Sequence, residues 1–151
     1  MKLSVRDEYA LRALIVLGET YEQGLTRIRA IADQQHIPRR FLEQILNDLR
    51  MGGFLESRRG VAGGYRLARA PRDITLAALL RHLQGFTTPP AEDAAASGSP
   101  APDDVVTAIQ GVMQEAQEAL FKVLEQVTLA DLCNRVRQQR EKTAAGFVYV
   151  I

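Results

Sequence analysis

Residues 37–68, IPRRFLEQILNDLRMGGFLESRRGVAGGYRLA, constrain the fold more than any other stretch of this chain. Apolar residues recur there every three to four positions, which predicts a helix with one buried face. Gly52-Gly53 then ends the helical pattern. Two segments with strand-forming side chains, 54–59 and 65–69, follow around a glycine-rich turn. The stretch therefore predicts a helix followed by a β-hairpin.

The helix predicted from Pro38 separates apolar from polar side chains. Five apolar residues are expected to face inward: Phe41, Leu42, Ile45, Leu46 and Leu49. The polar residues expected on the outer face are Arg39, Arg40, Glu43, Gln44 and Asn47. A shorter helix carrying Ile28, Ile31 and Ala32 precedes it, and residues 34–36 form the turn between them. Two short helices joined by a tight turn predict a helix-turn-helix.

The flanking segments extend this unit. Ser4 and Asp7 have the spacing of a capping box, which predicts the start of a first helix. A fourth helix is expected after Asp73 or Thr75, with leucines at positions 76, 79, 80 and 83 facing inward. The predicted fold class is mainly α: a winged helix-turn-helix with a two-stranded wing and a long C-terminal dimerisation helix.

Composition divides the chain into three predicted parts. Residues 1–86 form the winged helix-turn-helix domain, and residues 87–103, which hold four of the six prolines, form a flexible linker or loop. Residues 104–151 form a long helix, a short helix and an apolar tail. The long helix carries a heptad stripe made of Val106, Ile109, Met113, Ala116, Leu120, Val123 and Val127. We expect this stripe to pair with a second copy; the alternative is packing on the chain's own first helix.

The end of the chain has two further features. Thr128 is expected to cap a short helix with the sequence LADLCNRVRQQR. Residues 146–151, GFVYVI, are apolar and strand-forming, and we expect them to pack against the dimer or to add to a sheet edge.

Charge is unevenly distributed along the chain. Residues 1–86 carry a net charge of +5 and residues 87–151 one of −4, although the whole chain has only +1. A basic first part joined to an acidic second part indicates that the first contacts a polyanion. No apolar run is long enough for a membrane span, and the N-terminus is a poor signal peptide, so a cytoplasmic location is expected. The single Cys133 excludes an intramolecular disulfide.

The residue types on the predicted helix and hairpin suit duplex DNA. Arginine reads guanine, glutamine reads adenine and glutamate accepts from cytosine in the major groove. Arginines around a glycine-rich turn can contact phosphates or enter a minor groove. Any one of these side chains alone could be an ordinary solvated surface residue. The candidate DNA-binding residues are Arg27, Arg29, Pro38, Arg39, Arg40, Glu43, Gln44, Arg58, Arg59, Gly60, Gly63, Gly64, Tyr65 and Arg66.

Several motifs together resemble the IscR/NsrR/CymR family of bacterial transcription regulators. They are MKLS at the start, YALRAL from Tyr9, FLEQIL from Phe41, RGVAGGYRLAR from Arg59, ITLAALL from Ile74 and TLADL from Thr128. The resemblance covers residues 1–133 and implies a long dimerisation helix and palindromic operator DNA. It places major-groove positions on Pro38, Arg40, Glu43 and Gln44, and a wing arginine on Arg59.

The chain departs from the iron–sulfur members of this family in one respect. Those members carry three cysteines in the loop before the long helix, and the corresponding loop here has none. Glu8 stands where some relatives have an acidic ligand, but without the cysteines it is interpreted as a surface or capping acid. Since cluster iron needs thiolate or imidazole ligands, we expect no cofactor and no metal.

These observations favour a homodimeric DNA-binding regulator, acting as a repressor, that senses a partner protein or a small molecule. Oxidation of Cys133 is an alternative signal. A rival class is a protein-interaction module built on a winged-helix scaffold. The chain has no P-loop, no catalytic triad pattern and no HExxH-like ligand pair, so an enzyme is not expected.

Overall fold

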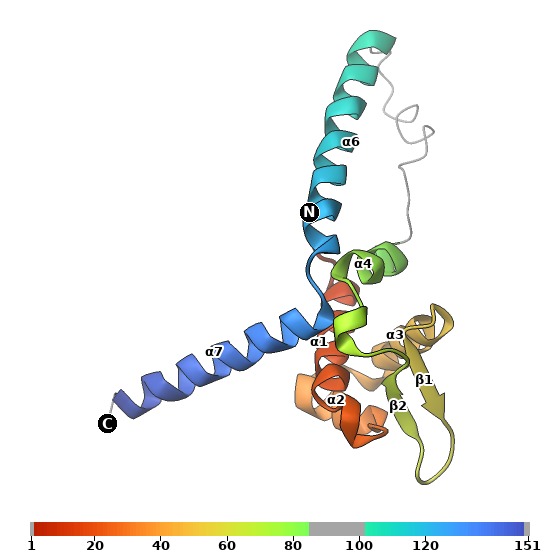
Figure 1. Cartoon of the computed structure of the whole chain (residues 1–151). Helices are drawn as coiled ribbons and strands as arrows, with labels where there is room; N and C mark the ends of the chain where they lie inside the picture. Colours follow the sequence, from red (N-terminus) through yellow and green to blue (C-terminus); the bar gives the residue numbers. More distant parts are fainter. Residues whose placement is uncertain (1, 85–101, 150–151) are drawn as a thin grey trace.

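A computed structural model describes residues 2–84 and 102–149 of the chain. Most of the predicted linker, residues 87–103, therefore lies outside the described residues. Helices and one hairpin form a compact body from which two long helices project (Figure 1). The elements in order are α1 (Val5–Glu19), η1 (Tyr21–Gln23), α2 (Ile28–Gln35), α3 (Arg39–Met51), β1 (Leu55–Arg58), β2 (Gly64–Leu67), η2 (Pro71–Asp73), α4 (Leu76–Gln84), α6 (Asp103–Glu125) and α7 (Leu129–Tyr149).

Helix α1 lies at the centre of the body. Its start is the predicted capping box: the Asp7 N–H donates to Ser4 Oγ over 3.1 Å, and the Ser4 N–H donates to Asp7 Oδ2 over 3.2 Å. Leu14 and Leu17 on α1 are fully buried and pack with residues of α2, α3, the hairpin and α4 in one core. Burying each such side chain contributes roughly 1.5–3 kcal/mol to folding. This core fixes the positions of α2 and α3.

The turn between α2 and α3 depends on two interactions. His36 ends α2 in the left-handed backbone conformation, with φ of 53°, and the backbone N–H of His36 donates to the carbonyl oxygen of Ala32. The guanidinium of Arg12 on α1 donates to the backbone oxygen of Gln35. A cation at the carboxyl end of a helix satisfies carbonyls that have no partner within the helix. Helix α1 therefore helps to fix the turn between α2 and α3 through Arg12.

Strands β1 and β2 form an antiparallel hairpin with Leu55 opposite Leu67 and Arg58 opposite Gly64. Both leucines are buried, whereas the middle of the hairpin projects into solvent. The strands are shorter than the predicted segments 54–59 and 65–69, because only the paired residues form the ladder. This hairpin is the predicted wing, so the fold class predicted from the sequence is confirmed.

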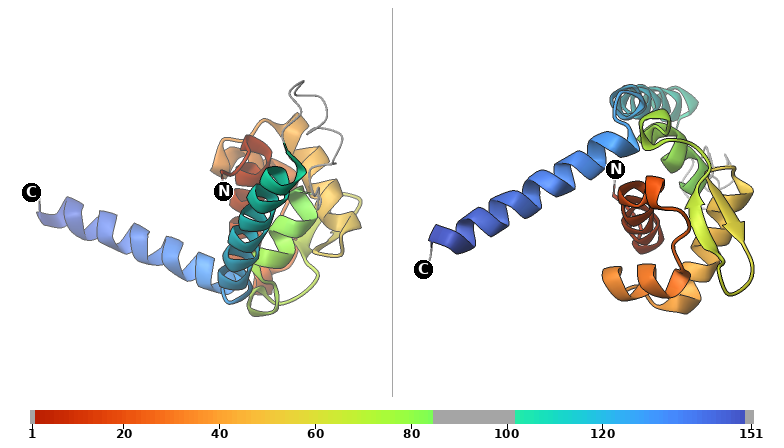
Figure 2. Two further views of the ribbon diagram at one scale, coloured as in Figure 1. Left: turned by 90° about the horizontal axis from the view of Figure 1, so that it is seen from above. Right: turned by 60° about the horizontal axis from the view of Figure 1, so that its bottom comes forward.

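The two long helices leave the body in different directions (Figures 1 and 2). Helix α6 touches the body at its carboxyl end, where Phe121 packs against Ala77 and Leu80 of α4. Helix α7 begins at a capping box between Thr128 and Asp131, which lowers the pKa of the Asp131 carboxyl through hydrogen bonds from Thr128. None of the helices among the described residues is long and apolar enough to cross a membrane.

Two expectations about local structure are wrong. Phe41 was expected to face inward but is 56% exposed, because it lies at the edge of the stripe formed by the four buried residues of α3. The segment predicted as a short helix and strand-forming tail is one helix, α7, that continues to Tyr149. Strand propensity acts only where a neighbouring strand is present, and the one glycine at position 146 costs a helix only about 1 kcal/mol.

Candidate nucleic-acid interface

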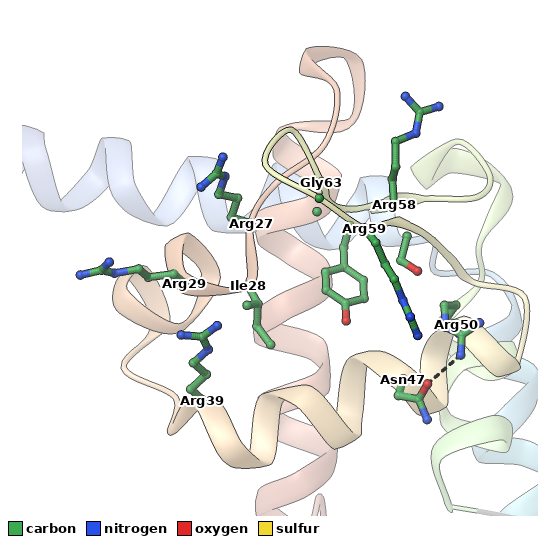
Figure 3. Close-up of a pocket in the computed structure, with 13 residues that line it drawn as sticks. Arg27, Ile28, Arg29, Arg39, Asn47, Arg50, Arg58, Arg59 and Gly63 are labelled. Atoms are coloured by element: carbon green, nitrogen blue, oxygen red, sulfur yellow. Dashed lines mark hydrogen bonds between the residues drawn. The ribbon is translucent and has the colours of Figure 1, made fainter.

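A basic hollow lies between α2, α3 and the wing. Its walls carry six arginines and no acidic side chain. The hollow is lined by Arg27, Ile28, Arg29, Arg39, Asn47, Arg50, Ser57, Arg58, Arg59, Gly60, Gly63, Gly64 and Tyr65. Figure 3 shows Arg59 reaching from the wing across the hollow toward Arg50 on α3, while Arg27, Arg29 and Arg39 stand on the opposite side. Six like charges around one concave surface fit a polyanion.

The wing is fastened to the start of α2 by its backbone. Thr26 and Tyr65 exchange two N–H···O bonds of 2.8 Å each, and the Arg27 guanidinium donates to the carbonyl of Val61 at the wing tip. This close approach requires glycine, since a Cβ at Gly64 would lie 2.6 Å from the Thr26 carbonyl oxygen. A Cβ at Gly63 would collide with the carbonyl of Arg58. The glycines thus shape the wing that carries the arginines.

Two side chains outside the hollow hold the carboxyl end of α3 through Asp48. The Arg6 guanidinium of α1 donates to Asp48 Oδ2 over 2.8 Å. The ring of His82 on α4 lies 2.9 Å from the backbone oxygen of Asp48 and stacks at a tilt on Phe54. Helix α3 is therefore fixed to α1 and α4 at one end and to the turn after α2 at the other. A rigid support of this kind positions a recognition helix on the double helix.

The structure gathers most of the predicted DNA-binding residues, but not all, into the basic hollow. Pro38 lines an adjoining hollow with Arg29 and Arg39 beside the turn between α2 and α3. The remaining predicted residues are exposed and lie outside the basic hollow: Arg40, Glu43, Gln44 and Arg66. Of these, Arg66 forms an ion pair with Glu56 at 2.9 Å, and Glu43 lies 3.6 Å from Arg39.

Four residues that line the hollow were not among the predicted DNA-binding residues: Ile28, Asn47, Arg50 and Ser57. Arg50 and Asn47 both line it, and the Arg50 guanidinium donates to Asn47 Oδ1 over 2.8 Å. The signal was present in the helical period, since positions 39, 43, 47 and 50 fall on one face of a helix. The DNA-binding residues predicted on α3 ended at Gln44 and so did not include Asn47 and Arg50.

The predicted dimerisation stripe on α6 is largely uncovered within this chain. Ile109, Met113 and Val123 are 56%, 64% and 63% exposed. Val106, Leu120 and Val127 are half-buried, and Ala116 is exposed. The alternative was that the stripe packs along α1 of the same chain. In the structure the buried residue of α6 is Phe121, which is not part of the stripe and packs against α4.

The fold and the basic hollow together define a DNA-binding protein of the winged helix-turn-helix class. A sequence profile of the Rrf2 family, described as "Iron-dependent Transcriptional regulator", matches residues 3–135. The chain belongs to this family, and its curated relatives are described as transcription regulators.

Individual relatives agree with the family match. The HTH-type transcriptional regulator slr0846 of Synechocystis sp. is 32% identical over 151 residues, which is the full length of both chains. The regulator NsrR of Geobacillus kaustophilus is 36% identical over 132 residues, 87% of this chain and 89% of that protein. The solved structure of CymR, the global cysteine regulator of Bacillus subtilis, superposes with a TM-score of 0.72 at 29% identity, covering 89% of this chain and 98% of CymR.

The donor atoms of this chain do not fit an iron–sulfur cluster, although the family description names iron. The chain has one cysteine and two histidines. Cys133 is buried against α1, with Sγ 3.8 Å from the Ile15 carbonyl oxygen. Burial, with a smaller effect from the Glu19 carboxylate, raises the pKa of this thiol to about 11. In the described ranges 2–84 and 102–149, no three Cys, His, Asp or Glu side chains gather as metal ligands.

Proposed function

We propose that this protein is a homodimeric, sequence-specific DNA-binding repressor of the Rrf2 family that works in the cytoplasm without an iron–sulfur cluster. The observation that carries the proposal is the basic hollow, where six arginines from α2, α3 and the wing face one concave surface. Bound DNA would place α3 in the major groove, with Arg39, Arg40, Glu43 and Gln44 at base edges. The wing arginines would then reach the flanking backbone or minor groove.

The exposed stripe on α6 supports the dimer. Water-exposed Ile109, Met113 and Val123 recur at heptad spacing on a helix of 23 residues. Burying three such side chains against the same three on a second copy contributes several kcal/mol, roughly 1.5–3 kcal/mol for each. A twofold dimer of winged helices binds a palindromic operator, because each copy reads one half-site.

The burial of the Cys133 thiol bears on which signal the protein senses in place of an iron–sulfur cluster. Because the pKa of Cys133 is raised to about 11, little reactive thiolate exists at neutral pH, which disfavours oxidation of Cys133 as the signal. A partner protein or a small molecule is therefore the proposed effector. The structural neighbour CymR is described as the global cysteine regulator of Bacillus subtilis, and this description supports a small molecule as one candidate effector.

The experiment is a pair of measurements on the full chain. DNA sites selected from a random pool are used in a mobility-shift assay, and the mass of the free protein is measured by sedimentation. We expect a wild-type dimer that binds a selected site far more tightly than random DNA, and a Val123→Asp chain that is monomeric and binds weakly. Wild-type protein that binds all sequences equally would instead favour the interaction module, for which the winged helix is only a scaffold.

A further inference from the structure

The last turn of α3 presents an arginine that no acidic side chain neutralises. Arg50 is exposed, lines the basic hollow, and pairs with no carboxylate among residues 2–84 and 102–149. The acid nearest to it along the helix, Asp48, lies roughly 160° around the helix axis from Arg50. The Asp48 carboxylate is held there by the guanidinium of Arg6 at 2.8 Å. The charge of Arg50 is therefore available to an anionic ligand.

Asn47 fixes the direction of the Arg50 side chain. The Arg50 guanidinium donates to Asn47 Oδ1 over 2.8 Å, a contact between residues three apart on one face of α3 (Figure 3). The amide of Asn47 is itself held, since its Nδ2 lies 3.8 Å from Met51 Sδ. A guanidinium has several N–H donors, so the bond to Asn47 leaves others free for phosphate oxygens. Asn47 thus orients the guanidinium without neutralising it.

The position of Arg50 along α3 suits the DNA backbone better than base edges. A recognition helix contacts base edges with its N-terminal residues, and the proposed readout set of α3 ends at Gln44. Arg50 lies roughly 9 Å further along the helix axis. Arg59 reaches from the wing across the hollow toward it (Figure 3). Two guanidinium groups that converge in a hollow lined by no acidic side chain fit the closely spaced phosphates of a DNA strand.

We propose that Arg50, oriented by Asn47, binds a backbone phosphate of the DNA strand that the wing contacts. The inference rests on the proposed DNA-binding function and divides α3 into two parts. Its first two turns read bases, and its last turn holds the backbone. Arg50 contacts a phosphate of its own, next to the one bound by Arg59, and Asn47 is a positioning residue that acts through Arg50.

The test is a salt titration of full-chain variants on two duplexes, the selected operator site and an unrelated sequence of equal length. Arg50→Ala is expected to lower the slope of log K against log salt by about 2 on both duplexes, because each copy of the dimer loses one phosphate contact. Arg50→Lys keeps the charge and should keep the slope. Arg50→Ala combined with Arg59→Ala should lower the slope by about 4. An Arg50→Ala protein with the wild-type slope, or a double variant whose slope equals that of Arg59→Ala alone, overturns the contact.

Asn47→Ala separates positioning from base readout. Because Asn47 acts through Arg50, its loss should weaken binding of both duplexes by the same factor, on the order of threefold to tenfold, with the slope unchanged. Weakening confined to the selected site, or no weakening, overturns the positioning role. Arg72→Ala removes an exposed arginine outside the basic hollow and should bind as the wild type does. Circular dichroism checks that each variant is helical.

The two duplexes also separate this inference from the proposed function. A wild-type protein that binds both duplexes equally overturns sequence-specific binding, and the slopes of the Arg50 variants still decide whether Arg50 contacts a phosphate. A wild-type protein that binds neither duplex overturns both proposals.

Discussion

Replacing Arg59 by alanine tests how the wing takes part in DNA binding. Arg59 is exposed, reaches into the basic hollow, and forms no ion pair within the described residues. Each arginine that contacts a phosphate releases counterions, and its loss lowers the slope of log K against log salt by about 1. A dimer has two wings, so Arg59→Ala should lower the slope by about 2. Between about 50 and 200 mM salt, the wild-type protein would lose roughly 15-fold more affinity than the variant.

The assay is a salt titration of operator binding by fluorescence anisotropy. Arg72→Ala is the matched control, because Arg72 is an exposed arginine on η2 outside the basic hollow. We expect its slope to equal that of the wild type. An Arg59→Ala protein with unchanged affinity and slope would refute the placement of the wing on the DNA backbone.

Four further tests concern the local structure. Gly63→Ala should weaken operator binding at least tenfold with little loss of helix by circular dichroism, because the new Cβ collides with the Arg58 carbonyl and reshapes the wing; unchanged binding would contradict this role. Cys133 should react with a thiol reagent only slowly at neutral pH and faster as the pH approaches 11. The pKa of Cys133 in the folded protein, about 11, lies above the unfolded value of 9.0, so the protonated thiol contributes stability below pH 9 that is lost as the pH rises through about 11. Urea unfolding of the wild type and of Cys133→Ala over this pH range measures the loss. If the free energies of unfolding of the two proteins change in parallel with pH, this contribution is disproved. Gly18→Ala should destabilise the fold by about 1–3 kcal/mol, because its Cβ would lie 2.8 Å from the Cys133 sulfur, and Cys133→Ala should relieve much of the loss.

Features determined by neighbouring residues could be predicted from the sequence. The capping box at Ser4 involves residues three positions apart, so their spacing was sufficient to identify it. Thr128 was predicted as a helix cap, and in the structure Asp131 completes a second box there. The buried stripe of α3 and the glycine-rich wing also follow from local periodicity and turn chemistry. The exposure of Phe41 was not predicted, because periodicity alone does not locate the edge of a buried stripe.

Features that depend on distant residues could not be predicted. The contacts of Arg6 and His82 with Asp48 join residues 42 and 34 positions apart, and no local pattern indicates them. The helical period places Arg50 on the same face of α3 as Arg39 and Asn47, but the sequence of α3 does not reveal that the wing lies beside that end of the helix and makes Arg50 part of the hollow. The end of α7 shows the converse: strand-forming residues became helical because no strand lies beside them among the described residues. The division into domains at residues 86 and 103 remains a prediction.

The most direct test of the account is selection of bound DNA from a random pool by the full-length wild-type protein, followed by sequencing. Two copies that read through α3 should enrich an inverted repeat whose half-sites are centred about one helical turn, or a multiple of it, apart. The Val123→Asp chain should enrich that repeat poorly or recover a single half-site. Enrichment of no sequence, or of one half-site by the wild-type protein, would contradict a paired winged helix-turn-helix that reads DNA.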